Sequence, residues 1–303
     1  MHIGMIGLGR MGANMARRLG RGGVQVHAFD VSPAARAALN GESGVTVAST
    51  LDALAGSQPA PRVVWLMLPA GEVTERTLES LLRLLARGDT IVDGANAYYR
   101  DSQRRARQSE AFGIRFVDAG VSGGVWGLAD GYAIMLGGAD VAVAPVIPFV
   151  RILAPAPDRG WLHCGPSGAG HFVKMVHNGI EYAMMQAYAE GFALLSAKKD
   201  LELDLAAIAQ MWRHGSVVRS WLLDLTAEFL SKDAVLAGIQ PHVADSGEGR
   251  WTAMEAVELG VPAPVISLAL MARFASQGNA DYSSKLLAMM RRMFGGHAVH
   301  TKP

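Results

Sequence analysis

The chain has 303 residues, half of them hydrophobic, and its 28 basic and 27 acidic residues give a net charge of +1. This length allows two domains with a sizeable core. The balanced charge excludes a global field that would attract nucleic acid or a membrane surface, so any anionic ligand must be held by a local cluster of side chains.

The composition also limits the compartment and the kinds of site. Cys164 is the sole cysteine, which excludes an intrachain disulfide and indicates a reducing compartment. We expect it to be a buried small residue. No Cys/His cluster has zinc-ligand spacing, no segment reaches the roughly 18 apolar residues of a membrane span, and no basic leader with a hydrophobic stretch precedes the first strand. We therefore expect a cytoplasmic protein without a metal site.

The first predicted element is a short apolar strand at residues 2–6, and a helical run at 13–19 follows closely. The turn between them has the pattern G-x-G-x-x-G and consists of Gly7, Leu8, Gly9, Arg10, Met11 and Gly12. Between a strand and a helix, such glycines permit a tight turn and close approach of a pyrophosphate to the helix N-terminus. The pattern predicts a dinucleotide site on a Rossmann-type, doubly wound α/β sheet.

A second strand at residues 24–29 ends at Asp30, eighteen residues after Gly12. A carboxylate at this distance accepts hydrogen bonds from the two adenosine ribose hydroxyls and repels a 2′-phosphate. The position therefore favours NAD as the cofactor. Arg36, six residues further on, leaves NADP as the less favoured alternative.

Two further buried strands are predicted at residues 63–68 and 90–93, and each ends in a loop-forming sequence, Pro-Ala-Gly or Gly-Ala-Asn. In a doubly wound sheet the ligand lies beyond the carboxyl ends of the strands. We expect these loops to line the nicotinamide half of the cofactor through Leu68, Pro69 and Asn96. The other interpretation of Asn96 is a simple turn residue.

The strand predicted at residues 115–118 leads into a run of small residues at 119–124. Such a loop exposes successive backbone N–H groups and the hydroxyl of Ser122, which suits a carboxylate ligand. A strand at 133–136, a helix at 141–153 and a short segment at 161–164 follow. Beyond them apolar residues recur every three or four positions at 203–215, 218–230 and 252–259. We expect a dinucleotide-binding Rossmann domain at 1–163 and an all-α substrate-binding and oligomerisation domain at 164–303.

Residues 167–199 contain no proline and predict one long helix. Lys174, His177, Asn178 and Glu181 fall at i, i+3, i+4 and i+7, so the helical period puts them on one side of this helix. A potential base, an imidazole, an amide and a carboxylic acid then share one stripe. The alternative is an ordinary solvent-exposed polar face.

The stretch H-F-V-K-M-V-H-N-G-I-E-Y at residues 171–182 resembles the signature helix of the decarboxylating 6-phosphogluconate dehydrogenases, a family of the β-hydroxyacid dehydrogenase superfamily. The resemblance implies oxidation of 6-phosphogluconate at C3 with reduction of NAD, followed by loss of CO₂ to give ribulose 5-phosphate, a reaction of the pentose phosphate pathway and of gluconate metabolism. It implies that Lys174 is the base, Glu181 the general acid, His177 and Asn178 positioning residues, and Tyr182 a phosphate ligand.

Other segments carry the same resemblance. D-A-G-V-S-G-G at 118–124 is similar to the family's substrate carboxylate loop, which implies roles for Ser122, Gly123 and Gly124, and D-G-A-N implies that Asn96 contacts both cofactor and substrate. M-A-R-F implies that Arg273 binds phosphate. The tail matches R-x-x-F-G-x-H, which implies that Arg291 and His297 complete the neighbouring subunit's site in a homo-oligomer, a dimer or tetramer of the short, NAD-preferring variety.

One loop departs from the family pattern. Longer members read K-G-T-G-K-W-T where this chain has Ser246 and Glu248 in place of the phosphate-binding lysine and threonine. A carboxylate beside a phosphomonoester is unfavourable, so Glu248 either points away or signals a different phosphate arrangement. The loop supports an alternative substrate, an unphosphorylated 3-hydroxy acid such as 3-hydroxyisobutyrate or gluconate. A non-catalytic nicotinamide-binding regulatory protein is the alternative of another class.

Overall fold

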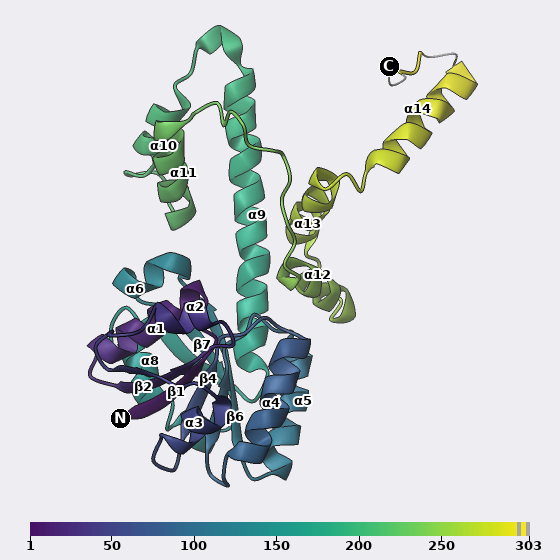
Figure 1. Ribbon diagram of the computed structural model, residues 1–303. Helices are drawn as coiled ribbons and strands as arrows, with labels where there is room; N and C mark the ends of the chain where they lie inside the picture. Colours follow the sequence, from purple (N-terminus) through teal and green to yellow (C-terminus); the bar gives the residue numbers. More distant parts are fainter. Residues whose placement is uncertain (296–297, 301–303) are drawn as a thin grey trace. The chain divides into compact units, whose positions relative to one another are not determined.

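The computed structural model describes residues 1–295 and 298–300. Contacts divide the chain into two compact units, Met1–Val176 and His177–Pro303. The first unit combines one sheet with helices and the described part of the second unit is helical (Figure 1). The predicted fold class, a Rossmann-type sheet followed by an all-α part, is confirmed. No described helix is long and apolar enough to span a membrane.

Eight strands form one sheet in the order β3-β2-β1-β4-β5-β6-β7-β8. Their bounds are β1 His2–Ile6, β2 Gln25–Phe29, β3 Val45–Val47, β4 Val63–Leu66, β5 Thr90–Asp93, β6 Arg115–Ser122, β7 Ala133–Gly137 and β8 Trp161–Gly165. Strands β1 to β6 pair in parallel, whereas β7 runs antiparallel to β6. The strand order reverses between β1 and β4, which is where a doubly wound sheet binds its ligand.

Helices cover both faces of this sheet (Figure 1). They are α1 Arg10–Arg21, α2 Pro33–Ala37, α3 Leu51–Gly56, α4 Glu72–Leu84, α5 Tyr99–Ala111, α6 Gly127–Asp130, α7 Asp140–Val143 and α8 Ile147–Leu153, with a short 3-10 turn, η1, at Gly124–Trp126. Apolar residues of α1 and α8 pack in one core cluster, and those of α3 and α4 in the other. The central strands of the sheet are buried on both faces, so their sequences are continuous apolar runs such as V-V-W-L in β4.

Two local predictions for this unit were wrong. The single helix expected at 141–153 is split into α7 and α8. Pro145 lies between them and has no backbone N–H to donate to the hydrogen bonds of a continuing helix. The loop expected to begin at 119 is strand as far as Ser122, because β6 continues alongside the antiparallel β7.

The long helix predicted at 167–199 is confirmed as α9, Ala169–Ala197. It is followed by a 3-10 turn, η2 Lys199–Leu201, and by α10 Leu205–Trp212, α11 Trp221–Lys232, α12 Glu248–Glu258, α13 Pro264–Ser276 and α14 Asp281–Gly295. α10 and α11 confirm the periodic segments at 203–215 and 218–230, while α12 starts four residues earlier than expected. The last two helices were not predicted.

The first turns of α9 belong to the sheet unit. The buried carboxylate of Asp118 on β6 accepts hydrogen bonds from the N–H groups of Gly168 (2.6 Å) and His171 (2.9 Å). It thus caps the N-terminus of α9 from the sheet. The contact-based division consequently falls after Val176, inside α9. The domain boundary between 163 and 164 stays a prediction.

We expect Asp118→Ala to lower the free energy of unfolding by about 3 kcal/mol, because two buried N–H groups lose a charged acceptor. Chemical denaturation followed by circular dichroism measures this. Asp158→Ala is the matched control, since the Asp158 side chain is exposed and, within the described part of the chain, pairs only with its neighbour Arg159. An equal effect of the two substitutions would contradict the capping role.

Candidate active site

The glycine-rich turn after β1 has the geometry of a dinucleotide cradle. Gly7 has φ +91°, a conformation that side chains rarely adopt. A Cβ at Gly12 would lie 1.9 Å from the carbonyl oxygen of Gly7, whereas a Cβ at Gly9 would meet nothing within 4 Å. Among the residues that the structure describes, no side chain caps the N-terminus of α1. The turn is therefore tightly closed at Gly12 and open at Gly9, and its uncapped N–H groups fit the pyrophosphate of NAD.

Asp30, the residue after β2, lies against this turn. Its Oδ2 accepts a hydrogen bond from the N–H of Leu8 (2.7 Å) and its Oδ1 accepts one from the N–H of Ser32 (2.8 Å). The guanidinium of Arg36 donates to the backbone oxygen of Asp30 (2.6 Å) and lies over the ring of Phe29. The predicted ribose ligand and the glycine-rich turn are thus brought together.

The loops after β4 and β5 adjoin each other, because these strands are paired. The hydroxyl of Thr74 on α4 donates to the carbonyl oxygen of Pro69 (2.8 Å), which fixes the first loop. In the second loop Asp93 accepts a hydrogen bond from the N–H of Ala95 (3.1 Å), and the next residue, Asn96, is exposed. Leu68, Pro69 and Asn96 therefore lie at the carboxyl edge of the sheet, as predicted.

Lys174 lies on α9 against strand β6. A Cβ at Gly120 would come within 2.4 Å of the Lys174 Cβ, so the glycine permits this close approach. Lys174 is buried, with 8% of its surface exposed. Ser122, two residues after Gly120, ends β6 and is half-buried, and Gly123 and Gly124 lead into η1. The predicted base and the predicted carboxylate loop thus share one strand end.

The next turns of α9 carry the other predicted catalytic side chains. His177 Nδ1 lies 3.0 Å from Asn178 Oδ1 and 3.9 Å from Glu181 Oε2. The side chains of His177 and Glu181 are 38% and 40% exposed. The three polar groups form one local cluster, as the helical period predicted. An acid, an amide and an imidazole there can exchange protons with a hydroxylated ligand and hold it.

Tyr182 and Arg273 are brought together in the second unit. The guanidinium of Arg273 lies 3.3 Å from the centroid of the buried Tyr182 ring, and Arg273 also donates to the carbonyl oxygen of Ala244 (2.8 Å). The cation over the ring face is a favourable contact. The Tyr182 hydroxyl lies 3.2 Å from Ser246 Oγ. This places both predicted phosphate ligands beside the loop that departs from the family pattern.

Glu248 is buried, with 1% of its surface exposed, at the start of α12. Its Oε2 accepts a hydrogen bond from the hydroxyl of Ser246 (2.6 Å), and its Oε1 has no partner among the described residues. A carboxylate only accepts hydrogen bonds, so the single proton of Ser246 points to Glu248 and Ser246 Oγ can only accept from Tyr182. The hydrogen bond from Ser246 to Glu248 is therefore directed, whereas the Tyr182 hydroxyl has two acceptors within reach, Ser246 Oγ at 3.2 Å and Asp245 Oδ1 at 3.4 Å.

One predicted residue is not brought to this cluster, and the position of another is not described. Arg291 lies on α14 with an exposed side chain, and His297 lies outside the described residues. The expectation for Cys164 was wrong, because it is half-buried on β8 at the edge of the sheet. Partial burial raises the pKa of its thiol.

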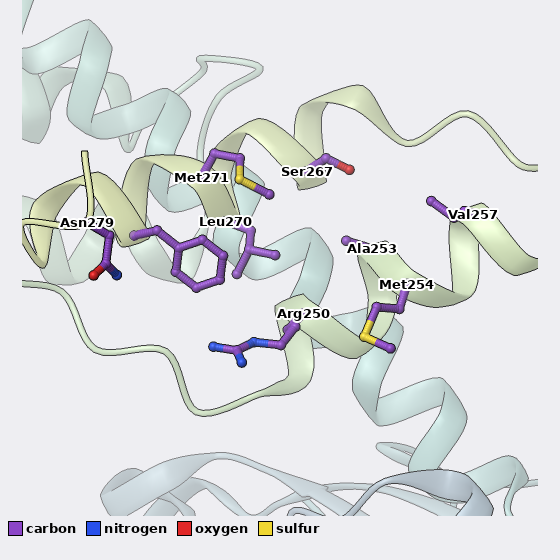
Figure 2. Close-up of a pocket in the computed structure, with 9 residues that line it drawn as sticks. Arg250, Ala253, Met254, Val257, Ser267, Leu270, Met271 and Asn279 are labelled. Carbon is purple, nitrogen blue, oxygen red and sulfur yellow. The ribbon is translucent and has the colours of Figure 1, made fainter. Parts of the chain in front are cut away.

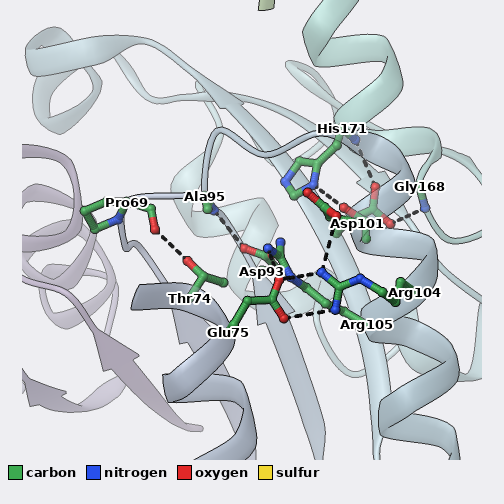
Figure 3. A network of polar contacts seen from close by, with 12 residues as sticks. Pro69, Thr74, Glu75, Asp93, Ala95, Asp101, Arg104, Arg105, Gly168 and His171 are labelled. Carbon is green, nitrogen blue, oxygen red and sulfur yellow. Dashed lines mark hydrogen bonds and ion pairs between the residues drawn. The ribbon is translucent and has the colours of Figure 1, made fainter. Parts of the chain in front are cut away.

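A buried ion-pair network beside the cofactor loops was missed (Figure 3). Arg105 on α5 binds Asp93 and Glu75, and Arg104 binds Glu75 from the exposed side. Burial alone would lower the pKa of the Arg105 guanidinium, but the two carboxylates outweigh burial and raise it. The hydrogen bond from Arg104 is the main cause that lowers the pKa of Glu75. The sequence shows only two adjacent arginines in a polar helix, with no signal that one is buried.

Substitutions in the glycine-rich turn separate folding from cofactor binding. We expect Gly9→Ala to leave the melting temperature unchanged, because its Cβ meets no protein atom, and to weaken NADH binding by about tenfold, or about 1.4 kcal/mol, because it fills the open side of the turn. Gly12→Ala should instead destabilise the fold by about 1–3 kcal/mol through overpacking. Thermal unfolding and NADH fluorescence titration measure both effects. Unchanged NADH affinity in Gly9→Ala would refute the cradle.

Comparison with known proteins gives the same assignment for both units. Residues 2–159 match the family model described as the NAD binding domain of 6-phosphogluconate dehydrogenase, and residues 170–293 match that of its C-terminal domain. The NAD(+)-dependent, decarboxylating 6-phosphogluconate dehydrogenase of Haloferax volcanii is 42% identical over 303 residues, covering 100% of this chain and 99% of the relative.

Longer relatives match over most of this chain. The NAD(+)-dependent, decarboxylating enzyme of Bacillus subtilis is 36% identical over 287 residues, which are 90% of this chain and 61% of the relative. The solved structure of Plasmodium falciparum 6-phosphogluconate dehydrogenase matches with a TM-score of 0.84 at 28% identity, covering 100% of this chain and 67% of that one. The predicted family is confirmed: the chain belongs to the 6-phosphogluconate dehydrogenase family.

Proposed function

We propose that the chain catalyses the NAD-dependent oxidative decarboxylation of 6-phosphogluconate to ribulose 5-phosphate and CO₂, the reaction that serves the pentose phosphate pathway and gluconate metabolism. The observation that carries the proposal is the buried Lys174 packed on Gly120, near the end of β6, in a chain of this family. The full-length relative from Haloferax volcanii is named for this chemistry. The single cysteine and the absence of a membrane-spanning helix among the described residues support a cytoplasmic location.

Lys174 acts as the base in this proposal. It removes the proton from the C3 hydroxyl of the substrate, and NAD held by the glycine-rich turn and Asp30 would supply the hydride acceptor. The resulting ammonium then polarises the new carbonyl oxygen and stabilises the negative charge that develops as CO₂ leaves. The same side chain thereby serves both halves of the reaction.

Glu181 protonates C1 after decarboxylation, as the general acid. Asn178 and His177 hold substrate hydroxyls and the carbonyl, and the hydrogen bond of His177 with Asn178 and its proximity to Glu181 support a joint role. Ser122, Gly123 and Gly124 bind the substrate carboxylate through the hydroxyl and backbone N–H groups.

NAD is the cofactor, with NADP the less favoured alternative. The Asp30 carboxylate, held beside the N–H of Leu8, offers an acceptor to a ribose diol and repels a 2′-phosphate. Arg36 donates to the backbone oxygens of Asp30 and Val31. Because the Arg36 guanidinium is engaged by these backbone oxygens and is thus less available to a 2′-phosphate, the contacts support a preference for NAD. One relative from Bacillus subtilis is named NADP(+)-dependent.

Arg273 and Tyr182 bind the substrate phosphate, and Arg291 and His297 of a neighbouring copy complete the site in a homo-oligomer. Most exposed large apolar side chains lie in the second unit, including Met289, Met290 and Met293 on α14. Helices α12 and α13 also line an open, mainly apolar groove of about 530 Å³ (Figure 2). Apolar surface on this scale supports association of copies, either as a dimer or as a tetramer.

The decisive assay follows reduced nicotinamide formation and CO₂ release from 6-phosphogluconate, with NAD and NADP in parallel. We expect turnover with NAD, a higher kcat/KM for NAD than for NADP, and a loss of about 10²–10⁴-fold in kcat in Lys174→Met. Gluconate and 3-hydroxyisobutyrate are the substrate controls. Turnover only of these unphosphorylated acids would replace the proposed substrate, and cofactor binding without any turnover would indicate a regulatory protein.

Deleting residues 290–303 tests the tail. We expect KM for 6-phosphogluconate to rise by about tenfold or more, since each hydrogen bond to a charged group contributes about 1.5–3 kcal/mol. Because the tail acts in trans, refolding the deletion variant together with Lys174→Met should restore turnover at low 6-phosphogluconate concentration, which neither variant supports alone. The restored site combines one chain's Lys174 with the other chain's tail. Unchanged kinetics, or no restoration in mixed oligomers, would contradict this role.

A further inference from the structure

Arg105 is the largest charged side chain enclosed in the first unit, with 1% of the side chain exposed. Its Nη1 donates to Asp93 Oδ2 (2.7 Å), and its Nε and Nη2 donate to Glu75 Oε1 (2.9 and 2.6 Å). Figure 3 draws Arg105 in one network with Asp93, Glu75 and Arg104. One rigid, planar group therefore joins two elements that are separate in sequence.

Each carboxylate that Arg105 binds lies next to a cofactor loop or next to a residue that holds one. Asp93 ends β5, and its second oxygen accepts from the N–H of Ala95, which shapes the turn immediately before Asn96. Glu75 lies in the first turn of α4, next to Thr74, whose hydroxyl holds the carbonyl oxygen of Pro69. The guanidinium thus sets the distance between the Pro69 loop and the Asn96 loop.

Helix α5 supports a third part of the same unit. Ser102, three residues before Arg105, has its hydroxyl 2.6 Å from Nδ1 of the buried His171. His171 lies one turn before Lys174 on α9, and its N–H binds Asp118. Ser102 and Arg105, on one face of α5, therefore contact the residues that hold both cofactor loops and the helix that carries the proposed base.

We propose that Arg105 is a positioning residue that holds the Pro69 and Asn96 loops in the geometry needed for the nicotinamide end of NAD, an inference that rests on the proposed function of these loops. Arg105 does not bind the cofactor itself. A misplacement of about 1 Å at reacting groups can reduce a rate by up to about a hundredfold. The adenosine end is held elsewhere, by the glycine-rich turn and Asp30, so the effect of Arg105 is confined to one half of the cofactor.

Arg105→Lys is the informative substitution. It keeps the positive charge that the buried carboxylates require, but a single ammonium cannot reproduce the forked contacts to Asp93 and Glu75. Arg104→Lys is the matched control, because Arg104 binds the same Glu75 from the exposed side and has no bond to Asp93. A general weakening of Glu75 contacts would affect both variants.

The experiment compares binding of NADH with binding of ADP-ribose, which lacks nicotinamide, by isothermal calorimetry on the intact protein. In Arg105→Lys we expect the Kd for NADH to rise about tenfold while the Kd for ADP-ribose stays within about twofold, and we expect kcat to fall about tenfold. Arg104→Lys should keep both affinities and kcat within about twofold of the wild type. This selective loss is what a merely structural role would not produce.

Three results would overturn the proposal: equal weakening of NADH and ADP-ribose, no change in either, or the same selective loss in Arg104→Lys. If Arg105→Lys does not fold, Asp93→Asn gives a second test, because it keeps the shape of the turn and removes the charge that Arg105 binds. The binding comparison needs no substrate. A wild-type protein that binds NADH but does not oxidise 6-phosphogluconate would therefore refute the proposed reaction and leave this test intact.

Discussion

The beginning of α9 is held to the sheet by a single buried carboxylate, and the position of Lys174 depends on this contact. Asp118 binds the N–H groups of Gly168 and His171, which belong to the unpaired donors of the helix N-terminus. The helix then runs along β6 closely enough that only a glycine fits at position 120. The cap by Asp118 and the lack of a side chain at Gly120 together determine where Lys174, the proposed base, lies relative to Ser122.

The features that sequence predicted well are those encoded in a few adjacent residues. The glycine-rich turn and Asp30 have fixed spacing, and the structure brings Asp30 into contact with the N–H of Leu8. The long helix α9 follows from composition and the lack of proline, and its period puts His177, Asn178 and Glu181 together. In each case the local backbone determines the spatial neighbours, so no distant contact had to be inferred.

The features that sequence could not predict depend on partners far along the chain. Whether Arg105 is buried is decided by Asp93 and Glu75, 12 and 30 residues away, and nothing in the polar helix α5 distinguishes it from Arg104. The extension of β6 to Ser122 depends on pairing with β7. The break between α7 and α8 is different, because Pro145 itself is the signal in the sequence that ends a helix. The apolar residues on both sides of Pro145 nevertheless continue with a helical period.

The loop at Ser246 and Glu248 can be reconciled with a phosphorylated substrate by the direction of its hydrogen bonds. Glu248 is turned inward and takes the Ser246 proton, so it removes a donor from the loop without exposing its own charge. Ser246 Oγ and Asp245 Oδ1 are both acceptors for the hydroxyl of Tyr182, the ring of which lies under Arg273. In the proposed function the positive charge for a phosphate then comes from Arg273 and from Arg291 of a neighbouring tail, because Ser246 and Glu248 offer none and Arg250 is paired with Asp245.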